Sequence, residues 1–192
     1  MKRVGVLSLQ GDFEAHGRTL ASLGAEPAFV STVGSLNDID GLIIPGGEST
    51  TMLKLLRMEN LLEPVAEFGR KKPIFGTCAG AILLANRVSN PEQESLGLVD
   101  LAIERNAYGR QVDSRVVNID ADPSFSSRTR PGSIEAVFIR APIIREVGPQ
   151  ARVLAEYAGD PVLVEEGRHL ISTFHPELTG DSRVHELFLS KL

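Results

Sequence analysis

The chain has 192 residues, 42% of them hydrophobic, and a formal net charge of −5 at pH 7. This length fits a single domain over residues 1–192, and no basic run exceeds Arg70-Lys71-Lys72, which argues against nucleic acid or an anionic membrane as a partner. The one cysteine precludes an internal disulfide and the apolar run before Gln10 is too short for a signal peptide or a membrane span, so we expect a cytoplasmic protein.

The first half of the chain alternates between strand and helix patterns. Strands are predicted at residues 3–9, 27–30, 41–44 and 73–75, and helices at residues 13–23, 49–58, 61–68 and 79–85. Short buried strands that alternate with helices predict a parallel sheet covered on both faces. Because right-handed crossovers bring the carboxyl ends of such strands to one edge, we expect the Gly46-Gly47 turn and the Cys78 turn to meet there.

The second half has a different pattern. Residues 88 to 149 contain many Asn, Asp, Pro and Ser breaks and short β-rich pieces at 115–119 and 136–139, which we interpret as an antiparallel addition beside the site. Strands are then predicted at residues 151–157, 162–165 and 169–174, and Asp181 is predicted to cap a last helix that runs to Leu192. The chain therefore predicts an α/β three-layer sandwich, with a mostly parallel central sheet flanked by helices and a small antiparallel addition.

The only cysteine lies where a predicted strand turns into a helix. Residues 74–82 read Ile-Phe-Gly-Thr-Cys-Ala-Gly-Ala-Ile. Such an elbow presents a nucleophile at a helix N-terminus, its glycines relieve crowding, and the backbone N–H of Ala79 would point at a developing oxyanion. A small buried cysteine at the end of a core strand has the same pattern, and the elbow alone does not separate the two interpretations.

A histidine and a carboxylate stand together far downstream. His175 follows the apolar run 170–174, Pro176 stiffens the exit, and Glu177 can accept a hydrogen bond from one ring nitrogen while the other faces a thiol. Taken alone, this segment is more simply a solvated turn. Taken with Cys78, it completes the constellation of a Cys-His-Glu nucleophile.

Two glycines follow the third predicted strand. Gly46 and Gly47 let the backbone bend sharply and present N–H groups to an anion, although a glycine turn capped by Ser49 fits as well. The loop lacks the lysine of a nucleotide-binding P-loop. The other histidines are scattered and have no cysteine partner, which argues against a zinc site: His16, His169 and His185. We expect no metal and no cofactor.

Together these motifs resemble the class I glutamine amidotransferases. Within that family the chain is similar to the glutaminase subunits of pyridoxal 5′-phosphate synthases, through blocks that span residues 9 to 179: Leu9-Gln10-Gly11-Asp12, Pro45-Gly46-Gly47-Glu48-Ser49-Thr50-Thr51, Asn106-Ala107-Tyr108-Gly109-Arg110-Gln111, Phe138-Ile139-Arg140-Ala141-Pro142 and Phe174-His175-Pro176-Glu177-Leu178-Thr179. The resemblance implies a flavodoxin-like amidotransferase fold, a triad of Cys78, His175 and Glu177, and hydrolysis of L-glutamine to L-glutamate and ammonia.

The resemblance also implies binding residues and a partner. Glutamine contacts map onto Gly46, Gly47, Glu48, Arg105, Ile139 and Arg140, and the oxyanion donors map onto the backbone of Gly47 and Ala79. The ammonia would pass to a (β/α)₈-barrel synthase subunit in a hetero-oligomer, for the synthesis of pyridoxal 5′-phosphate. Two positions depart from the family pattern. Glu165-Glu166 replaces a more basic or amide-bearing pair, and Arg115 stands where an aromatic residue often follows Asp113-Ser114.

Other classes of function remain open. A binding or regulatory module with an inactive pocket would be favoured by a substituted cysteine, histidine or glutamate, and all three residues are present. A stand-alone cysteine hydrolase of the same fold, or an amidotransferase subunit that feeds another synthase, fits the same residues. Thiol labelling by a glutamine analogue would separate the stand-alone hydrolase from a glutaminase.

Overall fold

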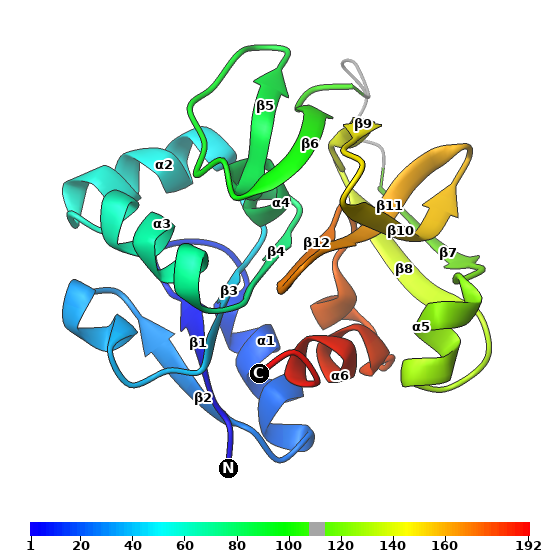
Figure 1. The fold of residues 1–192 in the computed structure, drawn as a ribbon, viewed down its shortest axis with the longest axis horizontal. Helices are drawn as coiled ribbons and strands as arrows, with labels where there is room; N and C mark the ends of the chain where they lie inside the picture. The colour runs from blue at the N-terminus through cyan, green and yellow to red at the C-terminus, as the bar shows by residue number, and fades with distance from the viewer. Residues whose placement is uncertain (108–113) are drawn as a thin grey trace.

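A computed structural model of the chain describes residues 1–107 and 114–192. Its largest sheet has the strand order β10-β11-β12-β4-β3-β1-β2 (Figure 1). The bounds are β1 Arg3–Leu7, β2 Glu26–Val30, β3 Gly41–Ile44, β4 Ile74–Thr77, β10 Ala151–Tyr157, β11 Asp160–Glu166 and β12 His169–Ser172. The strands from β12 to β2 pair in parallel, and β10 and β11 add an antiparallel edge. The predicted mostly parallel sheet is confirmed.

Helices cover both faces of this sheet (Figure 1). One face packs against α2 (Ser49–Met58), α3 (Leu62–Lys71) and α4 (Ala79–Leu84), and the other against α1 (Phe13–Ser22) and α6 (Arg183–Leu189). Strand β3 shows why: Leu42 and Ile44 belong to the first core, whereas Ile43 belongs to the second. Successive side chains of a strand point to opposite faces, so a strand buried on both faces is a continuous apolar run.

Side-chain caps fix where several helices begin. The carboxylate of Asp12 accepts from the backbone N of Ala15 at 3.2 Å, at the start of α1. Helix α2 is capped by Glu48 rather than by Ser49. Asp181 lies one residue before Ser182, the N-cap residue of α6, but its carboxylate accepts from the backbone N of Arg183, the first residue of the helix, at 3.1 Å. The predicted end of this helix at Leu192 is wrong, because α6 ends at Leu189. In the part of the chain that is described, no helix is long and apolar enough to cross a membrane.

The middle of the chain forms two small sheets beside the large one. Strands β5 (Ala85–Ser89), β6 (Val99–Glu104) and β9 (Ile143–Val147) form one, and β7 (Ser114–Ile119) and β8 (Ile134–Ile139) form the other, with α5 (Pro123–Arg128) between β7 and β8. The predicted antiparallel pairing is confirmed for β7–β8 and β6–β9 but is wrong for β5–β6, which is parallel. β5 and β6 are parallel because the connection between them brings the chain back to the start of β5 before β6 begins. There the backbone N of Leu98 donates to the carbonyl of Leu84 at 3.0 Å.

The positions that depart from the family pattern are engaged inside the chain. The Glu165 carboxylate pairs with Arg128 and with Lys191, each at 2.7 Å, and a Glu166 carboxylate oxygen accepts from the backbone N of Asp100 at 2.9 Å. These two glutamates therefore join β11 to α5, to β6 and to the C-terminal end of the chain. Asp113, which precedes the Arg115 departure, lies outside the described residues.

Candidate active site

Cys78 occupies the elbow between β4 and α4 in a rare backbone conformation. Its φ is 49° and its ψ is −103°, in a region where a residue with a Cβ is strained by about 1–3 kcal/mol. The backbone N of Cys78 donates to the carbonyl of Ser172 at 2.9 Å, which ties the elbow to the end of β12. The surrounding fold therefore enforces the strained turn that the sequence predicts.

Glycines on both sides of Cys78 allow this close packing. A Cβ at Gly80 would lie 2.0 Å from the carbonyl oxygen of Ile44, and one at Gly76 would lie 2.5 Å from the carbonyl oxygen of Gly80. Strands β3 and β4 and helix α4 can approach this closely only because both positions lack a side chain. Ala79 opens α4, so its N–H belongs to the first turn, whose N–H groups have no partner within the helix.

His175 and Glu177 lie just beyond the end of β12. This strand pairs with β4, which leads into Cys78. The ring Nδ1 of His175 is 2.7 Å from Oε1 of Glu177, and the backbone N of His175 donates to the carbonyl of Val137 at 2.8 Å. Burial of the ring acts to lower the pKa of His175, but hydrogen bonds and charge interactions with Cys78 and Glu177 outweigh it and raise that pKa to about 10. His175 thus bridges the thiol and the carboxylate, and holds a proton at neutral pH.

A cavity of ≈ 230 Å³ lies over the thiol. Its lining includes Gly47, Glu48, Ser49, Cys78, Ile82, Arg105, Asn106, Ile139, Arg140 and His175. Of the predicted site residues, Gly46, Ala79 and Glu177 lie outside this lining, but each is adjacent in sequence or in contact with a member of it. Sequence reasoning missed Ser49, Ile82 and Asn106 as lining residues, although Ser49 and Asn106 stand inside the motifs it singled out. Tyr108 to Gln111 of the same motif lie outside the described residues.

Charged side chains from two separate regions meet at the mouth of this cavity. The Glu48 carboxylate accepts from the backbone N of Thr51 at 2.7 Å, and backbone and side-chain hydrogen bonds from Thr51 and Thr50 outweigh partial burial and lower the pKa of Glu48. Arg105, from the loop after β6, donates to Thr50 Oγ1 at 2.6 Å and lies 3.4 Å from Glu48 Oε1. The site thus presents a carboxylate and guanidinium groups to a ligand.

The Gly46-Gly47 turn packs directly against the catalytic candidates. A Cβ at Gly46 would lie 2.4 Å from Cε1 of His175, and Gly47 has a φ of +134°. The Gln10 amide, oriented to satisfy both groups, donates to the Glu48 carbonyl at 3.0 Å and accepts from the Glu48 N–H at 3.3 Å. The sharp glycine bend is confirmed. Gln10 was missed as a site residue, although it lies in the quoted Leu9-Gln10-Gly11-Asp12 motif.

Two histidines that the sequence treats as scattered meet behind Glu177. His16 comes from α1 and His185 from α6, yet Nδ1 of His16 is 2.9 Å from Nε2 of His185. Nε2 of His16 is 3.4 Å from the second oxygen of Glu177. Sequence spacing holds no signal for this contact, because it joins helices at opposite ends of the chain. Over residues 1–107 and 114–192, no group of three or more His, Cys, Asp or Glu side chains could hold a metal ion.

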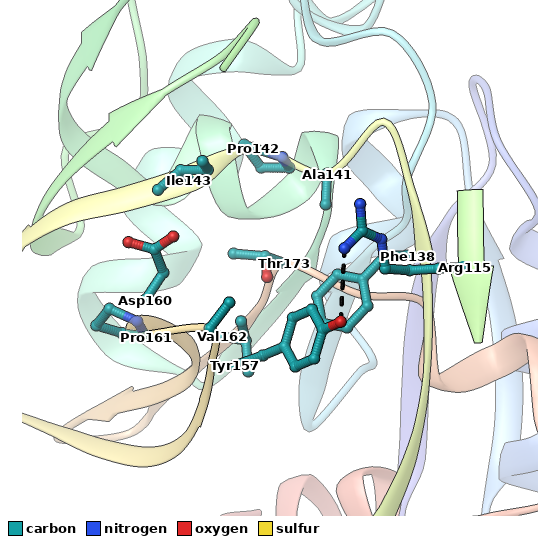
Figure 2. Close-up of a pocket in the computed structure, with 11 residues that line it drawn as sticks. Arg115, Phe138, Ala141, Pro142, Ile143, Tyr157, Asp160, Pro161, Val162 and Thr173 are labelled. Carbon is teal, nitrogen blue, oxygen red and sulfur yellow. Dashed lines mark hydrogen bonds between the residues drawn. The ribbon is translucent and has the colours of Figure 1, made fainter. Parts of the chain in front are cut away.

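A second cavity, of ≈ 160 Å³, lies across the segment 138–142 from the first. Ile139 and Arg140 face the cavity over Cys78, whereas Phe138, Ala141 and Pro142 line the second one. Figure 2 shows the Phe138 and Tyr157 rings side by side, and these rings are stacked with centroids 5.3 Å apart. Arg115 Nη1 lies 3.5 Å from the Tyr157 hydroxyl. The departure at position 115 therefore belongs to this second cavity and not to the site of Cys78.

Comparisons of sequence agree with this geometry. The model of the SNO glutamine amidotransferase family matches residues 6–192. A curated protein of Solibacter usitatus (strain Ellin6076), "Pyridoxal 5′-phosphate synthase subunit PdxT", is 67% identical over 192 residues, which cover 100% of both chains. The protein of the same name from Thermotoga neapolitana is 48% identical over 193 residues, which cover 97% of each chain.

Comparisons of structure give the same answer for the fold. A crystal structure described as glutamine amidotransferase aligns with a TM-score of 0.88 at 44% identity, over 98% of this chain and 97% of the other. The structure of PurLQS from Thermotoga maritima aligns with a TM-score of 0.78 over 98% of both chains, but at 18% identity it is similar in fold alone.

Proposed function

The chain belongs to the SNO glutamine amidotransferase family, and we propose that Cys78, His175 and Glu177 are the residues with which it hydrolyses glutamine. It is a glutaminase subunit of pyridoxal 5′-phosphate synthase. The single observation that supports this assignment of residues is the strained Cys78 elbow, which shares one cavity with a His175 whose ring is hydrogen-bonded to Glu177. An adjacent base and an orienting carboxylate are what a thiol needs to act as a nucleophile.

The reaction follows from where the proton lies. With the proton on His175, the sulfur of Cys78 attacks the side-chain amide carbon of glutamine, and the backbone N–H groups of Gly47 and Ala79 stabilise the oxyanion. His175 then gives its proton to the leaving nitrogen, so that ammonia departs and a thioester remains. Water attacks the thioester with His175 as the base, which releases glutamate and restores the thiol. Glu177 keeps the ring oriented and stabilises the imidazolium throughout.

Selectivity for glutamine comes from the charges around the cavity. The α-carboxylate of the substrate suits the guanidinium groups of Arg105 and Arg140, and its α-ammonium group suits the Glu48 carboxylate. Ile139 lies beside Arg140 in the same wall, and Gly46 and Gly47 leave room for the backbone to approach the amide. These contacts hold the amide carbon near the sulfur, where attack becomes effectively intramolecular.

The ammonia has to reach an acceptor before it is lost to water. We therefore propose that the chain docks on the barrel subunit of the synthase in a hetero-oligomer, in the cytoplasm, where a lone cysteine stays reduced. Docking would select the orientation of the Gly46-Gly47 peptide that completes the oxyanion site, because a glycine pair can reorient at little steric cost.

Labelling with an electrophilic glutamine analogue tests the site. An analogue that has a diazoketone or chloroketone in place of the amide should add to one residue, and peptide mass spectrometry should place the added mass on Cys78. Excess L-glutamine should protect the thiol, and Arg140→Ala should weaken both labelling and protection. Labelling that is equally fast with a non-amino-acid alkylating agent, and is not slowed by glutamine, would favour a stand-alone cysteine hydrolase instead.

A further inference from the structure

The triad carboxylate has a second neighbour on the side that faces away from His175. Oε1 of Glu177 is 2.7 Å from Nδ1 of His175, whereas Oε2 is 3.4 Å from Nε2 of His16. The Glu177 and His16 side chains are 1% and 0% exposed, so bulk solvent does not reach this oxygen. No hydrogen bond of standard geometry reaches Oε2 from the described residues, which leaves His16 as its polar neighbour.

The contacts of His16 decide which of its nitrogens is protonated. Nδ1 of His16 is 2.9 Å from Nε2 of His185, so one of these two atoms must donate to the other. If His16 donated from Nδ1, its Nε2 lone pair would face a carboxylate oxygen, which is repulsive. If His185 donates from Nε2, then His16 is free to donate from Nε2 to Glu177. Thr77 Oγ1, 3.4 Å from His16 Nε2, can accept or donate and so fits either arrangement.

Both histidines are neutral, as this arrangement requires. Burial is the main cause that lowers the pKa of His16 well below its usual value, and electrostatic interactions with His185 and His175, which disfavour a second proton nearby, lower it further. Burial alone lowers the pKa of His185 to about 4. Among the described residues, Glu177 and Thr77 also contact His16, and the Phe75 ring packs edge-on against both histidines, with ring centroids 6.3 Å from His16 and 5.8 Å from His185.

We propose that His16 is a positioning residue, which donates from Nε2 to Glu177 and so holds the carboxylate against His175, and that His185 fixes the tautomer of His16. The buried chain then runs from Cys78 through His175, Glu177 and His16 to His185. A neutral donor orients the carboxylate without cancelling its charge, so Glu177 keeps its full electrostatic effect on the imidazolium. This role deepens the glutaminase function proposed above and rests on it.

Two substitutions at position 16 distinguish the roles of the two ring nitrogens of His16. The amide nitrogen of glutamine reaches the place of Nε2, whereas asparagine reaches only the place of Nδ1. We expect His16→Gln to stay within about fivefold of the wild-type kcat for glutamate release. We expect His16→Asn to lower kcat about 10- to 100-fold, by analogy with the loss of a hydrogen-bond partner behind a metal-bound histidine. The KM for glutamine should change little, because His16 does not line the cavity.

A matched pair at position 185 tests the tautomer. His185→Gln keeps an N–H donor for Nδ1 of His16, whereas His185→Leu removes it and frees His16 to change tautomer. We expect His185→Leu to resemble His16→Asn in kcat and His185→Gln to resemble His16→Gln. If the histidines served only in packing, the two variants at each position would have similar kcat values, and any loss of kcat would follow the loss of thermal stability. This result would overturn the proposal.

A spectroscopic measurement on the wild-type chain covers the case of variants that do not fold. In ¹⁵N-labelled protein, long-range ¹H–¹⁵N correlations of the imidazole rings distinguish Nε2–H from Nδ1–H. We expect Nε2–H on both His16 and His185 at pH 7, and Nδ1–H on His16 would overturn the proposal. If the wild-type chain with its synthase subunit releases no glutamate, the proposed function fails; the tautomer measurement still decides the arrangement of the histidines.

Discussion

At the scale of single residues, the central feature is the proton on His175. Contacts with Cys78 and Glu177 overcome burial and raise the pKa of His175 to about 10. The imidazolium is therefore present over the whole neutral range, beside a sulfur that is most reactive as a thiolate. In the proposed reaction the same proton is the one that the leaving ammonia needs, so His175 would both prepare the nucleophile and later act as the acid.

Substitutions of His175 and Glu177 should differ in severity. His175→Asn removes the group that moves the proton and should lower kcat by several orders of magnitude, whereas Glu177→Gln leaves that group in place but misorients it, and should be about 10- to 100-fold less severe. Steady-state glutamate release by the two variants, with unfolding curves to confirm that both are folded, measures the difference. Equal losses, or a loss confined to a variant of His169, would contradict the assigned roles.

Residue types predicted the three residues proposed as the triad but not the groups behind them. A lone cysteine between glycines, and a histidine two residues before a glutamate at a strand end, are visible in the sequence. His16 and His185 are separated by 169 residues and stand in ordinary amphipathic helices, so only the packing of α1 beside α6 creates their contact. The same holds for Gln10. The sequence shows that it lies in a motif, but not that it contacts Glu48.

At the scale of elements, the elbow depends on how closely β3 and α4 approach. Gly80→Ala would force a Cβ to within 2.0 Å of the Ile44 carbonyl oxygen, and overpacking of this kind costs about 1–3 kcal/mol. We expect the variant to lose this much free energy of unfolding and to have a displaced Cys78. Gly34→Ala is the matched control, because no atom lies within 4 Å of its added Cβ, and it should be neutral or stabilising by about 0.4–1 kcal/mol.

Urea denaturation of both variants measures this difference. A Gly80→Ala variant as stable as the Gly34→Ala control would show that α4 can move away from β3. The strained conformation at Cys78 would then not be enforced by close packing.

Elements with strong local patterns were predictable, and the pairing of the weak ones was not. The buried strand β3 and the partly buried strand β10 have the predicted bounds, because an apolar run between turn residues leaves few alternatives. Strand β6 was not predicted, although Val99, Leu101 and Ile103 alternate with polar or small residues. Its parallel pairing with β5 depends on the path of the connection between them, which no local pattern encodes.

At the scale of the whole molecule, two hydrophobic cores share one sheet. Strands β1, β3, β4, β11 and β12 contribute side chains to both cores. If the sheet unfolds, both cores are exposed to water at once. We therefore propose that residues 1–192 unfold as a single cooperative domain. Calorimetry should give one transition, with a calorimetric enthalpy equal to the van't Hoff enthalpy. Two resolved transitions would contradict a single domain.

The buried histidines should make the protein sensitive to mild acid. Burial, first of all, lowers the pKa of His169 and of His185 to about 4, whereas an unfolded chain binds these protons near pH ~6.5. Between pH 4 and pH ~6.5 the unfolded chain thus binds more protons than the folded chain. The contribution of each neutral histidine to the free energy of unfolding is therefore complete above pH ~6.5, and it is lost as pH falls towards 4, by about 1.4 kcal/mol per pH unit. His185→Gln should reduce that slope by one histidine's share, and urea unfolding from pH 7 to 4.5 measures it.

His175 has the opposite effect on stability. Its pKa is raised to about 10, so its stabilisation is complete below pH ~6.5 and is lost as pH rises through 10. Stability should therefore be greatest near neutral pH. A stability that is flat from pH 7 to 4.5 would contradict the neutral state of the buried histidines.

The most direct test is the release of glutamate from L-glutamine by the wild-type chain and by Cys78→Ala, each with and without the synthase subunit. We expect the wild-type rate to rise at least about tenfold when the synthase subunit is added, which needs only ~1.4 kcal/mol of preference for the competent state. Cys78→Ala, still folded and still able to bind glutamine, should lose several orders of magnitude under both conditions. A Cys78→Ala variant that retains more than about a tenth of the wild-type rate, a gap of only ~1.4 kcal/mol in the activation barrier, would contradict the assignment of Cys78 as the nucleophile.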